Sequence, residues 1–110
     1  MVQRKYDIDL VFSALADPTR RKVIEMLCKE PASVSELSSH FGMAMPSFMQ
    51  HLNILENSGI ITSEKKGRVR ICYLNSKALL PMEHWLSEQK NLWEKRLNQL
   101  DSYLERMKRM

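Results

Sequence analysis

The sequence predicts a mostly α-helical fold with one small β-hairpin. Apolar residues recur at helical spacing in several segments, and two short runs of β-branched and apolar residues flank Gly67. Helix-capping residues stand where several of the helical segments would begin. With 110 residues, of which 44% are hydrophobic and 27% charged, the chain has the size and composition of a single domain over 1–110.

Two helices are predicted near the N-terminus, over 7–16 and 18–29. Asp17 is a favourable N-cap for the second helix, and Pro18 suits its first helical position. The residues expected on the buried face of this second helix are Val23, Ile24, Leu27 and Cys28.

A third helix is predicted to begin after Ser33, because Ser33 and Glu36 have the spacing of a capping box. Gly42 is expected to end this helix with a positive φ, which glycine adopts at little cost. The third helix and the one that follows it would form a helix-turn-helix over about 34–58.

The fourth helix, about 46–58, is predicted to pack on the core and to expose a polar face. Phe48, Leu52 and Leu55 share its inner face. The opposite face and its flanks suit contact with DNA, because glutamine bonds to adenine edges, serine to most bases, and apolar groups to thymine methyls. The predicted DNA-contacting residues of this segment are Met45, Ser47, Met49, Gln50, His51 and Asn53. The alternatives are a solvated polar face and, for His51, a packing role at the edge of the core.

Two strands, Ile60–Glu64 and Val69–Leu74, are expected to form a hairpin, here called the wing (60–75). The wing carries four Lys or Arg against one Glu, whereas residues 31–59 carry two Glu and neither Lys nor Arg. Attraction for phosphate would therefore come from the wing, as arginine can bond phosphate oxygens or enter a minor groove. The expected contacts are Lys65, Lys66, Arg68 and Arg70. A solvated turn with solubilising charges is the alternative.

A long helix of about 82–108 is predicted to end the chain. Its apolar residues have heptad spacing, and they are Leu86, Trp93, Leu97, Leu100, Leu104 and Met107. Such a stripe is too long to be covered by so small a core, so we expect a partner helix and a homodimer. The element order is that of a winged helix-turn-helix with a long C-terminal dimerisation helix.

Segments 14–27, 45–60 and 67–73 resemble the ArsR-type bacterial repressors in their order and residues, including Asp17-Pro-Thr-Arg20. The resemblance implies a homodimeric transcriptional repressor that an inducer releases from its operator. It also implies that the first and last helices build the dimer, which adds Phe12 to the expected interface.

Two departures from the family pattern limit what carries over. The family has serine where Ala44 and Met49 stand, so DNA contacts by those hydroxyls cannot be transferred. The cysteine pair of the metal-sensing members is missing from the third helix, and the last helix offers only His84 and Glu88. We therefore expect neither a metal nor a cofactor, and the sequence identifies no inducer.

The partner we expect is double-stranded DNA carrying an inverted repeat. A protein-interaction module of the same fold and a thiol or metal sensor are the other hypotheses.

For Cys28 and Cys72 the alternative to a redox role is that both are small buried hydrophobes. No catalytic constellation is evident, so we do not expect an enzyme. The lack of an apolar run of about 20 residues and the polar start predict a cytoplasmic location without a membrane partner. The net charge of +4 permits nucleic acid as a partner but does not require it.

Overall fold

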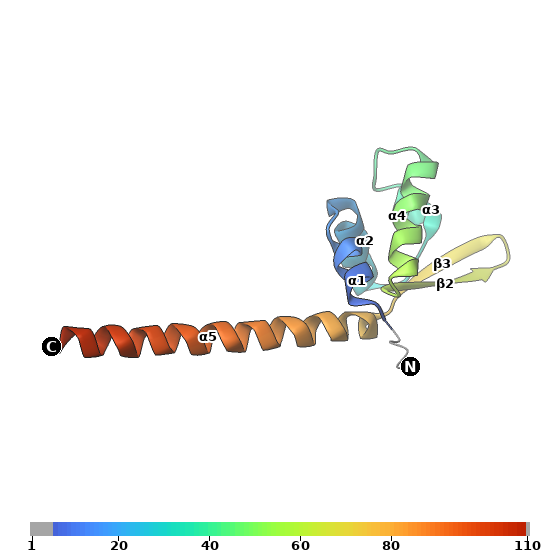
Figure 1. Cartoon of the computed structure of the whole chain (residues 1–110). Helices are drawn as coiled ribbons and strands as arrows, with labels where there is room; N and C mark the ends of the chain where they lie inside the picture. The colour runs from blue at the N-terminus through green and yellow to red at the C-terminus, as the bar shows by residue number, and fades with distance from the viewer. Residues whose placement is uncertain (1–5, 110) are drawn as a thin grey trace. The chain divides into compact units, whose positions relative to one another are not determined.

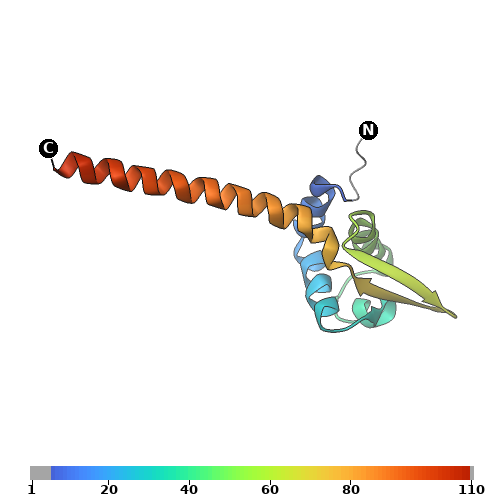
Figure 2. The ribbon, with the colours of Figure 1, turned by 90° about the horizontal axis from the view of Figure 1, so that it is seen from below.

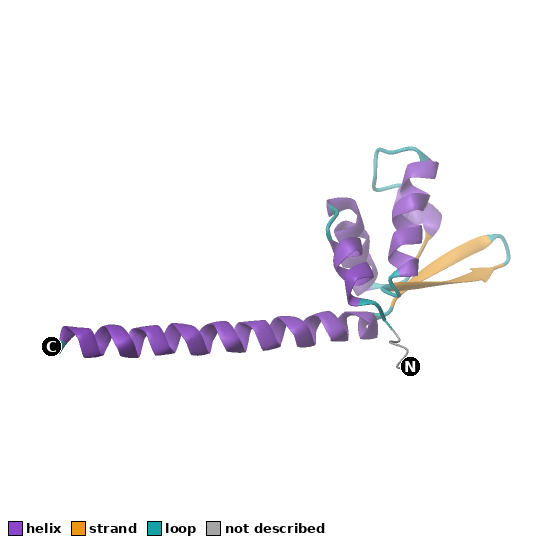
Figure 3. Ribbon diagram, in the orientation of Figure 1, coloured by secondary structure: helices purple, strands orange, loops and turns teal. Residues whose placement is uncertain are grey.

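The structure, a computed structural model, describes residues 6–109. It consists of two compact units, an N-terminal unit that ends at Leu80 and a C-terminal unit that begins at Pro81. Helices dominate both units, and the N-terminal unit adds a small antiparallel sheet (Figures 1 and 3). The predicted fold class is thereby confirmed. Most of the polar start used above, Met1–Lys5, lies outside the described residues.

The first two helices lie within one residue of their predicted bounds. Helix α1 covers Ile8–Leu15, and helix α2 covers Pro18–Lys29. The Asp17 carboxylate caps α2 by accepting a hydrogen bond from the backbone N–H of Arg20 at 3.1 Å. The capping signal in the sequence therefore corresponds to an observed cap.

Helix α3 covers only Val34–Ser38. Ser33 caps its start, because the Ser33 hydroxyl accepts from the Glu36 N–H at 3.1 Å. The prediction for Gly42 is wrong, since Gly42 does not have a positive φ. Helix α3 ends at Ser38, before the glycine, and the chain continues in tight turns in which no residue has a positive φ.

Helix α4 covers Met45–Asn57 and follows α3 after an irregular loop (Figure 3). Its N-cap, Ala44, makes no side-chain capping bond, as expected for alanine. The chain leaves α4 at Gly59, whose φ is +85°. A Cβ at that glycine would lie 2.8 Å from the ring of Tyr6, so both the conformation and the space require glycine.

Three antiparallel strands form the sheet in the order β1-β3-β2. Strands β2 (Ile61–Lys66) and β3 (Val69–Leu74) make the predicted hairpin, which projects from the helices of the N-terminal unit (Figure 2). Strand β1 (Ala32–Ser33) was not predicted and pairs with two residues of β3. In the two-residue hairpin loop only Gly67 has a positive φ, +65°, which is the pattern of a type II′ turn.

Apolar side chains from α1, α2, α3, α4 and the sheet meet in one core. The buried apolar residues are Val11, Ala14, Val23, Leu27, Leu37, Phe48, Leu52, Leu55, Ile60, Ile61, Cys72 and Ala78. All three residues predicted to anchor α4 are among them. Cys28 is not, because its thiol is exposed, and Ile24 is only partly buried. Cys28 follows Leu27 and lies about 100° further around α2, which takes it off the buried face.

A short 3₁₀ helix at Ser76–Leu79 leads to α5, which covers Leu80–Lys108. None of the residues of α5 is buried, although many of them are apolar. No helix in residues 6–109 combines the length and apolar character that a membrane crossing needs.

Candidate nucleic-acid interface

Helix α4 presents an uncharged polar face to solvent. Phe48 and Leu52 hold its inner side in the core, while Ser47, Gln50 and Asn53 are exposed. Beside them Met45 is 47% exposed, and Met49 is partly buried. Amide, hydroxyl and thioether groups of this kind can read base edges and thymine methyls without adding charge.

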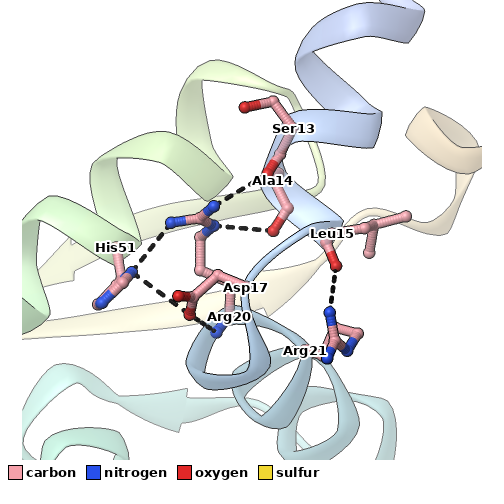
Figure 4. A network of polar contacts seen from close by, with 7 residues as sticks. All are labelled: Ser13, Ala14, Leu15, Asp17, Arg20, Arg21 and His51. Carbon is pink, nitrogen blue, oxygen red and sulfur yellow. Dashed lines mark hydrogen bonds and ion pairs between the residues drawn. The ribbon is translucent and has the colours of Figure 1, made fainter.

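His51 differs from its neighbours on α4 because its ring contacts two side chains of the N-terminal unit, those of Arg20 and Asp17 (Figure 4). Its Nδ1 lies 3.1 Å from Nη1 of Arg20 and 3.7 Å from Oδ2 of Asp17. Of the two roles predicted for His51, this arrangement favours the one at the edge of the core. The ring fixes the middle of α4 to the start of α2.

Arg20 is the centre of that network. Its Nε donates to the carbonyl of Ala14 at 2.8 Å, and its Nη2 donates to the carbonyl of Ser13 at 2.9 Å. Arg21 donates in the same way to the carbonyl of Leu15 at 2.7 Å. These bonds serve carbonyls in the last turn of α1, where regular helical hydrogen bonds come to an end and positive charge is favourable.

The pKa of Asp17 is lowered from its ordinary value of 3.8. Burial raises this pKa, but the bond from the Arg20 N–H, the charges of His51 and Arg20, and the Thr19 N–H outweigh burial. Asp17 is therefore both the cap of α2 and the acidic member of the Arg20 network. Sequence reasoning found the cap but missed Arg20, whose only signal was its place in the Asp-Pro-Thr-Arg segment.

The tip of the wing carries three exposed cations, Lys65, Lys66 and Arg68. None of the three forms an ion pair with another residue in the described part of the chain. Their charges are therefore free to attract an anionic partner.

Arg70 has a different environment from the other wing cations. Its guanidinium is ion-paired with Glu56 of α4, and its Nε donates to the hydroxyl of Ser63 at 2.9 Å. The Ser63 hydroxyl in turn donates to Glu56 at 2.8 Å. Sequence reasoning gave neither Glu56 nor Ser63 a role, because they lie seven or more residues from their partners. The only signal for Glu56 was its place in the family-like segment 45–60.

The helix and the wing share one hollow of about 230 Å³. From the predicted set it brings together Met49, Arg68 and Arg70. Its remaining lining comes from the start of α3 and the base of the turn, namely Ser33, Val34, Ser35 and Val69. At this concave surface one predicted residue of α4, Met49, therefore meets two of the wing, Arg68 and Arg70, whereas the other seven predicted residues lie outside its lining.

The residues predicted for a dimer interface are all exposed. Phe12 of α1 is 37% exposed, and the stripe on α5 ranges from 43% at Leu97 to 63% at Trp93. His84 and Glu88 form an exposed pair at 2.9 Å. Across residues 6–109, no three His, Cys, Asp or Glu side chains gather as a metal site.

The two cysteines lie in unlike surroundings. Cys28 is exposed, so the prediction that both are buried is wrong for this residue. Cys72 is buried in β3, and burial raises the pKa of its thiol above 9.0. Arg70 lowers this pKa and Glu56 raises it, which leaves the burial effect dominant.

A short helix, a turn, an exposed second helix and a cationic hairpin together define a winged helix-turn-helix protein, a class that binds DNA. Residues 17–63 match the profile of the arsR family of bacterial regulatory proteins. The chain belongs to this ArsR family and is a DNA-binding transcriptional regulator.

Individual relatives agree with this assignment. The transcriptional repressor SdpR of Bacillus subtilis is 34% identical over 76 residues, which are 69% of this chain and 84% of SdpR. An ArsR family transcriptional regulator of known crystal structure is 50% identical in sequence to this chain. The two structures align with a TM-score of 0.75 over 79% of this chain and 96% of that one. An ArsR-like regulator from Rhodococcus sp. RHA1 is 27% identical, with a TM-score of 0.71 over 84% and 88% of the two chains.

Proposed function

We propose that the protein is a homodimeric repressor that binds an operator with an inverted repeat. The observation that carries the proposal is the exposed, uncharged face of α4 beside the three free cations of the wing. A relative with 34% identity, SdpR, is named a transcriptional repressor. In a dimer the two α4 helices would enter successive major grooves about one helical turn apart. The protein would act in the cytoplasm, beside the bacterial chromosome.

The two parts of the interface have separate tasks in this proposal. Helix α4 reads the sequence, with Gln50 as the main base contact and Ser47, Asn53, Met45 and Met49 around it. The wing supplies attraction for phosphate through Lys65, Lys66 and Arg68. We assign His51 and Arg70 to holding the helix and the wing in place, because both are engaged within the unit.

Salt dependence tests the electrostatic part. Three wing cations in each of two chains give about six phosphate contacts, so affinity should fall roughly a thousandfold between about 50 and 200 mM salt. The operator would first be selected from a random duplex pool, and binding would then be followed by fluorescence anisotropy. An affinity that does not change with salt would contradict this role of the wing.

Two substitutions distinguish the readout of bases by α4 from the attraction of phosphate by the wing. Gln50→Ala should reduce the preference for the selected operator over a scrambled duplex, with a loss of about 1–3 kcal/mol on the operator. Arg68→Ala should weaken both duplexes by a similar factor. Equal losses on both duplexes for Gln50→Ala would show that the readout assignment is wrong.

The dimer is proposed from the apolar stripe of α5. Between Leu86 and Met107 the stripe extends over about 32 Å of helix, with every member exposed. Leu97→Glu should produce monomers in sedimentation velocity, whereas the matched control Gln99→Glu, off the stripe on the same helix, should leave the dimer intact. A dimer that persists in Leu97→Glu and Leu100→Glu would contradict the proposal.

The absence of Lys and Arg from α4 also fits a surface that binds protein. A folded dimer that retains no duplex from the random pool but binds one protein partner would favour this second function.

A further inference from the structure

Glu56 connects the end of α4 to both strands of the wing. The hydroxyl of Ser63, on β2, donates to Oε1 of Glu56 at 2.8 Å, and Nη2 of Arg70, on β3, donates to the same oxygen. The Nε of Arg70 donates to the Ser63 hydroxyl at 2.9 Å, which closes a triangle of bonds. We call Glu56, Ser63 and Arg70 the wing clamp. Its side chains are partly buried, with Glu56 25% and Arg70 33% exposed.

The position of the clamp matters because, among residues 6–109, no third strand pairs with the outer wing. Strand β1 pairs with β3 only at Ile71 and Cys72. From Arg70 to the tip, the two strands of the wing pair only with each other. A two-stranded ribbon without a third strand or a packed face is only marginally ordered. The clamp meets the wing where the support of β1 ends.

Repulsion between two cations of the wing is a second reason for a carboxylate at the position of Glu56. Arg70 lies directly opposite Lys65 in the antiparallel register. Like charges at such positions destabilise a strand pair. The carboxylate of Glu56 neutralises Arg70, and Lys65 keeps its charge for an outside partner. A carboxylate on the proposed DNA-binding side therefore has a structural explanation.

We propose that Glu56 is a positioning residue for DNA binding. Through Ser63 and Arg70 it fixes the wing relative to α4, so that the wing cations reach the DNA backbone while α4 lies in the major groove. This inference rests on the proposed function. It differs from a direct role of Arg70 in phosphate binding, because it predicts that removal of an acidic residue weakens binding to DNA.

The test is whether removal of the Glu56 carboxylate weakens or strengthens binding to DNA. Removal of a bystander carboxylate near DNA would leave binding unchanged or strengthen it, since one repulsion is lost. We expect Glu56→Gln to weaken operator binding by about tenfold. The matched control is Glu64→Gln, which has the same charge change at an exposed residue of β2 outside the clamp, and it should bind at least as tightly as the unaltered protein. Circular dichroism would verify that both variants remain folded.

A coupling measurement distinguishes positioning from general damage to the fold. Arg68→Ala should cost about tenfold in the unaltered chain but less than about threefold when Glu56 is already Gln, because the tip no longer meets the DNA. Operator binding would be measured by fluorescence anisotropy at one salt concentration. Equal changes for Glu56→Gln and Glu64→Gln, or an Arg68→Ala loss that is the same in both backgrounds, would overturn this inference alone. An unaltered chain that binds no duplex would overturn it together with the proposed function.

Discussion

Arg20 offers a quantitative test of how the helices of the N-terminal unit are held together. Its three guanidinium nitrogens contact the carbonyls of Ala14 and Ser13 and the ring of His51, at 2.8, 2.9 and 3.1 Å. The side chain therefore joins the end of α1, the start of α2 and the middle of α4 (Figure 4). Arg20→Ala removes all three contacts at once.

The expected cost follows from the surroundings of each bond. The bond to Ala14 is partly buried and has a charged donor, for which about 1.5–3 kcal/mol is typical. The bond to Ser13 is exposed, and its carbonyl also accepts from Ala16, so it adds about 0.5–1 kcal/mol. From these two bonds, with nothing counted for the contact with His51, we expect Arg20→Ala to lower the free energy of unfolding by about 2–4 kcal/mol.

Arg21→Ala is a matched control on the same helix, with the same change of charge and of helix propensity. Arg21 makes one exposed bond, to Leu15 at 2.7 Å, so its loss should cost only about 0.5–1 kcal/mol. Urea unfolding, followed by circular dichroism at a single protein concentration, would compare the two. Equal shifts of the midpoint at unchanged slope would refute the reasoning, because the difference in partners would then have no energetic effect.

Two further predictions concern stability. The lowered pKa of Asp17 means that its stabilising effect is complete above the ordinary value of 3.8 and is lost as the pH falls through the folded-state value. The difference in unfolding free energy between the protein and Asp17→Asn should shrink in that acid range, and a difference that stays constant there would contradict this. Gly59→Ala should destabilise by more than about 1 kcal/mol because of its positive φ and the ring of Tyr6, whereas Gly42→Ala, with open space and an ordinary φ, should be neutral or stabilising in thermal unfolding.

The sequence predicted the helices well because their signals are local. Periodic apolar residues such as Phe48 and Leu52 determine which face of α4 is buried, and capping at Asp17 determines where α2 begins. Both signals operate within a few residues of the chain. The hairpin was found for the same reason, since Gly67 and its flanking β-branched residues are adjacent.

The errors and omissions have a different origin. Strand β1 is two residues long and exists because Ala32 pairs with Cys72, forty positions later in the chain, so no local pattern reveals it. Cys28 is exposed because it lies about 100° beyond Leu27 around α2, so the predicted buried face of that helix was too wide. The turn after α3 closes without a left-handed residue, so Gly42 had no conformational role for the prediction to find.

The candidate site shows most clearly what sequence reasoning could not reach. Arg68 and Arg70 are two residues apart and look equivalent in the sequence, yet one is free and the other is bound to Glu56. The difference arises because Arg70 lies within β3, where its guanidinium meets Glu56 near the end of α4, whereas Arg68 lies in the turn before β3 begins. Net charge thus overstates the number of cations available to DNA. In our proposal α4 is fixed in the middle through Arg20 and at its end through Arg70, so these arginines orient the recognition surface and leave the attraction of phosphate to the tip of the wing.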